Sequence, residues 1–194
     1  LYTTITQSHM TRKHGPWKIT SSKTTYTNPW ISVREDAVIR PDGSPGIHGV
    51  ITIKEGVAVL PIDAKQNVYL VEEFKYALGK RTPETVGGGV DDGETHLTAA
   101  KREMLEELGI RARVWTKLGR VDPLTTMALC RTELFLAEDV TLGETVDHEA
   151  SETIKMIRMP LKEAVNKVQS NKITHGPSCV LILKTYLHIK NKTP

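Results

Sequence analysis

Apolar and polar residues alternate along the first part of the chain, which is the pattern of half-buried β-strands. Two runs rich in β-branched residues cover residues 17–27 and 30–39, and a cluster of turn residues at 41–46 separates them from a third run at 48–53. The Pro, Gly, Asp and Ser residues of that cluster are typical of tight turns. We therefore expect a small antiparallel β-sheet that forms an N-terminal subdomain, residues 10–54.

The remainder of the chain combines strands with helices. A continuous apolar run at residues 56–62 is typical of a strand buried on both faces. Further strands are expected at residues 68–74, 82–86, 112–121, 129–140 and 153–159, and helices at 95–108, 161–169 and 178–189. This order of elements predicts an α/β fold, with a mixed β-sheet between helical layers in an α/β/α sandwich.

The first of these helices has a clear amphipathic pattern. Leu97, Ala100, Met104 and Leu108 recur at helical spacing and predict one buried stripe. Gly109 follows the stripe and is expected to end the helix as a C-terminal cap.

The neighbouring face of this helix carries three carboxylates. Glu103, Glu106 and Glu107 stand at helical spacing, where like charges repel by roughly a few tenths of a kcal/mol per pair. Such a cluster offers the hard oxygen ligands that Mg²⁺ or Mn²⁺ prefers. Taken alone, these residues also fit a solvated acidic face on which Arg102 pairs with Glu106.

Composition narrows the class of protein. With 39% hydrophobic and 25% charged residues, the 194-residue chain is typical of one globular domain with a small extra subdomain. The net charge of +3 is mild and the basic residues are scattered, so nucleic acid is not expected as a partner. No apolar stretch approaches the roughly 18 residues of a membrane helix, so a membrane is not expected either. Cys130 and Cys179 are predicted to be reduced thiols, which favours the cytoplasm. Residues 1–9 have the character of an expression-vector remnant and are set aside.

Residues 88–110 match the pattern G-x5-E-x7-R-E-U-x-E-E-x-G-U at every fixed position, where U is a bulky apolar residue. This array resembles the Nudix box, and its many fixed positions make it far more specific than a short glycine motif. The similarity covers nearly all of residues 17–186, including the segments TNPW, VREDAV, VAVLPID and LVEEFKY. The chain resembles the branch of ADP-ribose pyrophosphatases and nucleoside diphosphate sugar hydrolases.

This resemblance implies a Nudix fold, with a catalytic domain at residues 55–194, and a homodimer. It also implies an enzyme that uses Mg²⁺, or Mn²⁺, to hydrolyse the pyrophosphate bond of a nucleoside diphosphate sugar such as ADP-ribose. The substrate would be a small-molecule nucleotide, and the products a nucleoside monophosphate and a sugar phosphate. Two other functions stay open, namely a non-catalytic Nudix-fold nucleotide sensor and a nucleoside triphosphate pyrophosphohydrolase.

The resemblance also implies which residues bind the metal ion. The expected ligands are Glu103, Glu107, Glu106 and the backbone carbonyl of Gly87. Glu106 is in addition a catalytic candidate, because it would share or bridge ions. Arg102 is expected to orient a glutamate, and Glu94 either supports the loop or reaches a metal ion through water.

The general base would come from the loop at residues 147–152. By resemblance it is either Glu152 or Glu149, and His148 is a further alternative. A base within reach of the attacking water would contribute roughly 10² to 10⁴ in rate.

The expected substrate contacts lie elsewhere in the chain. Trp30 would stack on the nucleobase, Lys75 would contact a phosphate group, and Glu84 would contact the substrate or the base. Gly88 belongs to a run of three glycines, which lets the backbone approach phosphate or metal with no Cβ in the way.

Two segments depart from the branch pattern. Asp122-Pro123-Leu124 stands where these enzymes carry Ser-Pro-Gly, and His175 begins a step that is usually acidic and then threonine. Because of these departures, GDP-mannose, ADP-glucose and other sugar nucleotides stay open as substrates in place of ADP-ribose.

Overall fold

The computed structural model describes residues 11–143 and 154–192 of the chain. It divides into two compact units. The first contains the residues up to Lys54 together with Leu124–Cys130, and the second contains Glu55–Pro123 and the residues from Arg131 onward.

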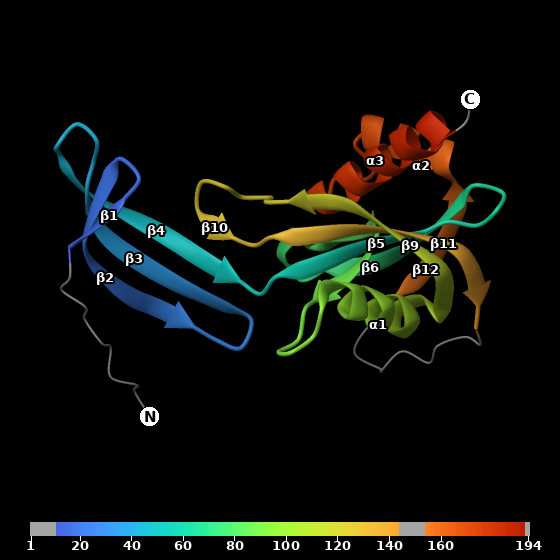
Figure 1. Ribbon diagram of the computed structural model, residues 1–194, viewed down its shortest axis with the longest axis horizontal. Coiled ribbons are helices and arrows are strands. Elements are labelled where there is room, and N and C mark those ends of the chain that lie inside the picture. Colours follow the sequence, from blue (N-terminus) through green and yellow to red (C-terminus); the bar gives the residue numbers. More distant parts are fainter. Residues whose placement is uncertain (1–10, 144–153, 193–194) are drawn as a thin grey trace. The chain divides into compact units, whose positions relative to one another are not determined.

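The first unit is a β-sheet with the strand order β1-β2-β3-β4-β10 (Figure 1). Its strands are β1 (Arg12–His14), β2 (Trp17–Thr27), β3 (Ile31–Ile39), β4 (Pro45–Ile53) and β10 (Ala128–Leu129). The first four pair antiparallel, which confirms the predicted antiparallel sheet, and β10 adds to β4 in parallel.

The turn between β3 and β4 is shorter than the sequence pattern predicted. The backbone N–H of Arg40 donates to the carbonyl of Ser44, and the Asp42 carboxylate accepts from the Ser44 N–H at 2.9 Å. The turn is therefore complete at Ser44, and Pro45 begins the strand, a position where its missing N–H is tolerated.

The second unit has a mixed sheet with the order β8-β5-β11-β9 and an antiparallel sheet with the order β12-β6-β7. The mixed sheet contains β5 (Gly56–Pro61), β8 (Val86–Gly89), β9 (Ile110–Val121) and β11 (Thr132–Leu142), and the other sheet contains β6 (Asn67–Lys75), β7 (Lys80–Glu84) and β12 (Lys155–Pro160). The helices are α1 (His96–Leu108), α2 (Leu161–Gln169) and α3 (Gly176–Lys192), and a 3₁₀ turn, η1, covers Tyr76–Leu78. Figure 1 shows α1 on one side of the sheets and α2 and α3 on the other, as predicted for an α/β/α sandwich.

Two predicted strands are each divided in the structure. The strand expected at residues 82–86 is the end of β7 and the start of β8, which belong to different sheets. The division falls at Thr85, whose N–H donates to the side chain of Ser178 and not to a neighbouring strand. The strand expected at 129–140 is likewise the end of β10 and most of β11, because those two segments pair with different partners.

Each side of the sheets has its own hydrophobic core. The core under α1 includes Val57, Val59, Val86, Ala99, Ala100, Met104, Leu108 and Phe135. The core under α2 and α3 includes Leu60, Leu70, Leu134, Leu136, Leu161, Leu181 and Ile182.

The predicted stripe of α1 is wrong at one position. Leu97 is 37% exposed, whereas Ala99 is fully buried. The first turn of the helix lies outside the core, since Thr95 and Thr98 are exposed as well, and burial begins at Ala99.

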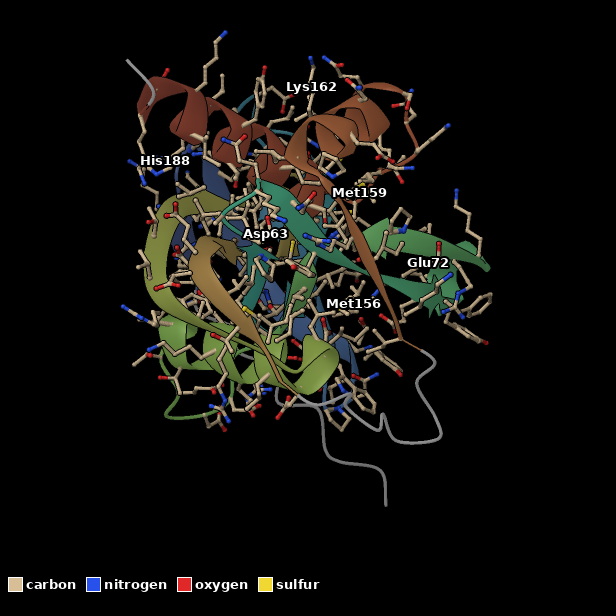
Figure 2. All side chains as sticks on the ribbon, turned by 90° about the vertical axis from the view of Figure 1, so that its right-hand side faces the viewer. Asp63, Glu72, Met156, Met159, Lys162 and His188 are labelled. Carbon is tan, nitrogen blue, oxygen red and sulfur yellow. The ribbon has the colours of Figure 1, made fainter. Side chains whose placement is uncertain are left out.

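The antiparallel sheet is held at its edge by a charged contact. Arg158 on β12 donates to the Asp63 carboxylate at 2.5 Å. Burial by itself raises the pKa of Asp63, but this contact and the hydrogen bonds from Asn67 and Lys65 together outweigh burial and lower the pKa. Figure 2 shows Met156 and Met159 along β12, and they pair with Val71 and Val68 of β6. Strand β12 is thus fixed to β6 within the second unit.

Both cysteines are free thiols in half-buried positions. Among the described residues, no helix has the length and apolar character needed to cross a membrane.

Candidate active site

Helix α1 has a defined beginning and end. The side chain of Thr95 accepts a hydrogen bond from the N–H of Thr98 at 3.1 Å and caps the N-terminus. Gly109 adopts a φ of 63°, and its N–H donates to the carbonyl of Leu105 at 2.9 Å. With its apolar face on the sheet, the helix presents the predicted carboxylates on its remaining surface.

The glycines of β8 bring the backbone close to this helix. A Cβ at Gly88 would lie 2.0 Å from Oε1 of Glu103, and one at Gly87 would lie 2.5 Å from the carbonyl oxygen of Val57. Since real Cβ atoms do not approach other atoms so closely, only glycine lets Glu103 lie against this strand.

Arg102 links the carboxylates of α1 with the segment that precedes this helix. Its guanidinium donates to Glu103 at 2.7 Å, to Glu106 at 3.1 Å and to Glu94 at 3.1 Å from two of its nitrogens. A further hydrogen bond at 3.0 Å reaches the carbonyl of Gly89. The fork-shaped guanidinium can make these bonds at once, so it holds the loop and the helix together.

Glu103 and Glu107 are the half-buried members of the acidic face, whereas Glu106 is exposed. Burial raises the pKa of Glu103, and the contact with Arg102 opposes this. Burial and the nearby Glu103 raise the pKa of Glu107 to about 8, against a hydrogen bond from the backbone of Gly87 and the charge of Lys75. Oε2 of Glu107 is buried with no hydrogen-bond partner. Both carboxylates are therefore costly to ionise unless a cation binds there.

The side chain of Lys75 lies at the same site. Its ammonium is 2.5 Å from a carboxylate oxygen of Glu73 and 3.6 Å from one of Glu84. Burial by itself lowers the pKa of Lys75, but the contacts with Glu73 and Glu84 and the charge of Glu107 outweigh it and raise the pKa. Lys75 is therefore charged and is electrostatically coupled to the acidic face of α1.

Glu84 is buried at the end of β7. Its carboxylate accepts from the hydroxyl of Thr82 at 2.7 Å and lies 3.4 Å from Nδ1 of His175. Of the residues expected to contact substrate, the structure thus brings Lys75, Glu84 and Gly88 together with the carboxylates.

The other expected site residues belong to the first unit or lie outside the described residues. Trp30 belongs to the first unit and is 72% exposed. The backbone N–H of Trp30 donates to the side-chain carbonyl of Asn28 at 2.9 Å. Glu149, Glu152 and His148, the candidates for the general base, lie outside the described residues.

The arrangement fits a divalent cation, although its carboxylates do not form a ready cluster. In residues 11–143 and 154–192, no group of three or more Asp, Glu, His or Cys side chains is close enough to hold a metal ion. Glu103 and Glu106 instead accept hydrogen bonds from Arg102. The unpartnered oxygen of Glu107, the raised pKa values of Glu103 and Glu107 and the hard oxygen donors all fit Mg²⁺ or a similar ion.

Sequence patterns did not reveal the buried contacts around Glu84. Thr82, Thr85 and Ser178 were not among the predicted site residues, and His175 was noted only as a departure from the branch pattern. Thr85 and Ser178 are 93 positions apart, so no local spacing could have linked them.

Comparisons with known proteins agree with this geometry. Residues 17–51 match the model of the nucleoside diphosphate sugar hydrolase N-terminal domain, and residues 52–177 match that of the NUDIX domain. The chain is 28% identical over 169 residues to an ADP-ribose pyrophosphatase of Mycobacterium tuberculosis, covering 86% of this chain and 81% of the relative. It is 25% identical over 151 residues to an ADP-ribose pyrophosphatase of Bacillus subtilis, covering 77% and 80%.

Among solved structures, a crystal structure of an ADP compounds hydrolase has the same fold. The TM-score is 0.80 at 19% identity, and the match covers 90% of this chain and 95% of that chain. Because the NUDIX model matches well over half of the sequence, the chain belongs to the NUDIX family, as a pyrophosphohydrolase that resembles the ADP-ribose pyrophosphatases.

Proposed function

We propose that this enzyme hydrolyses the pyrophosphate bond of a nucleoside diphosphate sugar such as ADP-ribose, with Mg²⁺ as cofactor. The products are then a nucleoside monophosphate and a sugar phosphate. The observation that carries the proposal is the pair of half-buried carboxylates, Glu103 and Glu107, since Oε2 of Glu107 is buried with no partner and the pKa values of both groups are raised. The similarity to proteins named ADP-ribose pyrophosphatase supports the choice of substrate.

Some residues of the site would bind the metal ion, and others would bind the substrate. Glu103 and Glu107 would hold the metal ion, with Glu106 and the Gly87 carbonyl as further ligands. When bound by these residues, Mg²⁺, or alternatively Mn²⁺, would neutralise phosphate charge and help to activate the attacking water. Arg102 keeps the glutamates oriented.

The substrate is held by the other residues of the site. The ammonium of Lys75 lies beside the acidic face, where it can neutralise a diphosphate oxygen. Gly88 leaves room for the phosphates close to the backbone. Trp30 is proposed to stack on the base, and it is 72% exposed within the described residues.

Other parts of the proposal rest on the sequence. The general base, Glu149 or Glu152, stays a prediction, as do a homodimer and a cytoplasmic location. The free state of both cysteines is compatible with that location.

A substrate panel tests the proposal. ADP-ribose, ADP-glucose, GDP-mannose, UDP-glucose and nucleoside triphosphates are incubated with Mg²⁺, and release of monophosphate is measured. Glu103→Gln and Glu107→Gln should each lower kcat/KM by at least about 100-fold, because even outer-shell partners of a metal site are worth roughly 10- to 100-fold. Undiminished turnover in both variants would refute the site, and turnover of triphosphates alone would refute the substrate class.

A further inference from the structure

Lys75 interacts with carboxylates that come from three different elements. Its ammonium is 2.5 Å from Oε2 of Glu73 on β6 and 3.6 Å from Oε2 of Glu84 at the end of β7. The third carboxylate is that of Glu107 on α1. Burial lowers the pKa of Lys75, but the contacts with Glu73 and Glu84 and the charge of Glu107 outweigh burial and raise the pKa. The positive charge of Lys75 therefore acts at a residue that we propose as a metal ligand.

The same charge acts on Glu107 in return. Burial and the nearby Glu103 raise the pKa of Glu107, whereas a backbone hydrogen bond from Gly87 and the charge of Lys75 lower it. A positive group that stabilises an ionised carboxylate also repels a second cation bound to that carboxylate. Because Glu107 is half-buried, water and salt screen this repulsion less than on an open surface.

The repulsion affects a divalent ion more than it affects a proton. Without the charge of Lys75, Glu107 would hold its proton more tightly, and an incoming metal ion would have to displace that proton. The same ion would also be spared the repulsion of the ammonium. Because Coulomb energy is proportional to charge, the second effect is about twice the first for Mg²⁺ or Mn²⁺. Removal of the Lys75 charge should therefore tighten binding of the metal ion.

A bound diphosphate reverses this effect. Its oxygens carry negative charge, and the proposed function places Lys75 and the metal ion on the same diphosphate. An anion between two cations attracts both and compensates their mutual repulsion. Lys75 would then oppose the metal ion in the free enzyme and stabilise the substrate in the complex.

We propose that Lys75 couples the binding of the metal ion to that of the substrate: its ammonium opposes a divalent cation at Glu107 until a diphosphate places its negative charge between the two. This inference deepens the proposed function and rests on it for the metal site and for the substrate. The free enzyme would thus bind the metal ion weakly, and the metal ion and the substrate would be held together.

Titration with Mn²⁺ in the absence of nucleotide tests the first half of the inference. Electron paramagnetic resonance measures the free Mn²⁺ at pH 8 and gives the dissociation constant. Lys75→Gln should bind Mn²⁺ at least about fivefold more tightly than the parent, the lower end of the usual coupling between two sites. Lys75→Met should do the same, and it decides the matter if the Gln variant does not fold. Lys75→Arg keeps the charge and should stay within about twofold of the parent.

The matched control is Lys162→Gln. It removes the same charge from an exposed position of α2, which lies on the other side of the sheets from α1 (Figure 1). This variant should leave the Mn²⁺ dissociation constant unchanged. A gain seen in Lys75→Gln alone would then come from the place of the charge and not from the net charge of the protein.

Turnover of ADP-ribose at saturating Mg²⁺ tests the second half. Lys75→Gln should raise KM roughly tenfold, the loss of about one hydrogen bond to a charged group. The metal ion is thus expected to bind more tightly and the substrate more weakly. A variant with a damaged fold would instead lose affinity for both.

Unchanged or weaker affinity of Lys75→Gln and Lys75→Met for Mn²⁺ would overturn the inference, as would an equal gain in Lys75→Arg. A parent protein that binds no Mn²⁺ would refute the proposed metal site and the inference with it. If ADP-ribose is not hydrolysed, the proposed substrate fails, while the Mn²⁺ titration still decides whether Lys75 opposes the metal ion.

Discussion

At the scale of single residues, Glu107 couples the stability of the metal-free protein to pH. Its pKa is raised from 4.5 to about 8 by burial and by Glu103. Between these two pH values the folded protein binds a proton that the unfolded chain has lost, so stability falls as the pH rises. By pH 8 the free energy of unfolding is lower by on the order of a few kcal/mol than it is near pH 4.5. A cation bound to the ionised carboxylate would remove this cost.

Glu107→Gln should therefore raise the melting temperature of chelator-treated protein at pH 8, by roughly 2–4 °C per kcal/mol recovered. Near pH 4.5, the ordinary pKa of this group, the variant should melt close to the parent. Mg²⁺ should stabilise the parent and have little effect on the variant. Glu106→Gln is the control, since that side chain is 58% exposed and should matter little for stability. A Glu107→Gln variant that melts below the parent at pH 8 would contradict the role of burial.

A second prediction at the scale of single residues concerns Gly88. Gly88→Ala would place a Cβ 2.0 Å from a carboxylate oxygen of Glu103, so that side chain must move. We expect a loss of activity of roughly 100-fold with a normal circular dichroism spectrum, because a displaced metal ligand costs at least as much as an outer-shell partner. Gly49→Ala is the matched control, since a Cβ there meets nothing within 4 Å. Full activity in Gly88→Ala would show that Glu103 need not lie against the strand.

At the scale of elements, α1 depends on its N-terminal cap. Thr95 is the cap residue and accepts from the N–H of Thr98 at 3.1 Å. Thr95→Ala should lower stability by about 1 kcal/mol, a fall in melting temperature of about 2–4 °C, and Thr95→Ser should change it little. Equal melting of the Ala and Ser variants would mean that the hydroxyl does not support the helix.

The elements were predicted best where local pattern decides them. The end of α1 at Gly109 and its buried Met104 follow from a period of 3.6 residues and a residue that tolerates a positive φ. The strand expected at residues 82–86 was divided because Thr85 bonds to Ser178, which lies in a different element. A sequence pattern does not reveal such a distant hydrogen-bond partner. It does reveal the strands on either side, because apolar and polar residues alternate along them.

At the scale of the whole molecule, the first unit has an apolar sheet face that fits the expected homodimer. Ile47, Ile51 and Ile53 alternate along β4 and therefore share one face of the sheet. Their partners on β3 are Ala37, Val33 and Ile31, with one charged residue, Glu35 opposite Gly49, between them. Ile47 is 68% exposed. An exposed apolar face of this kind is typical of an interaction surface.

Light scattering after gel filtration should thus give twice the 21.6 kDa mass of one chain. Ile47→Lys should shift the protein towards monomer, because a charge in an apolar interface must be desolvated. Val114→Lys, at a half-exposed position of the second unit, is the matched control and should leave the mass unchanged. A parent protein that is monomeric at every concentration would refute the dimer.

The sequence by itself determined the helix that carries Glu103, Glu106 and Glu107, the glycine beside it and the family of the fold. These features follow from residue spacing along a short stretch, which one helix or strand preserves. Only the tertiary structure decided that Arg102 also bonds to Glu94 and to the carbonyl of Gly89, that Oε2 of Glu107 is buried with no partner, and that His175 lies 3.4 Å from Glu84. Burial and long-range contacts depend on how distant segments pack, and that packing is a property of the folded chain as a whole.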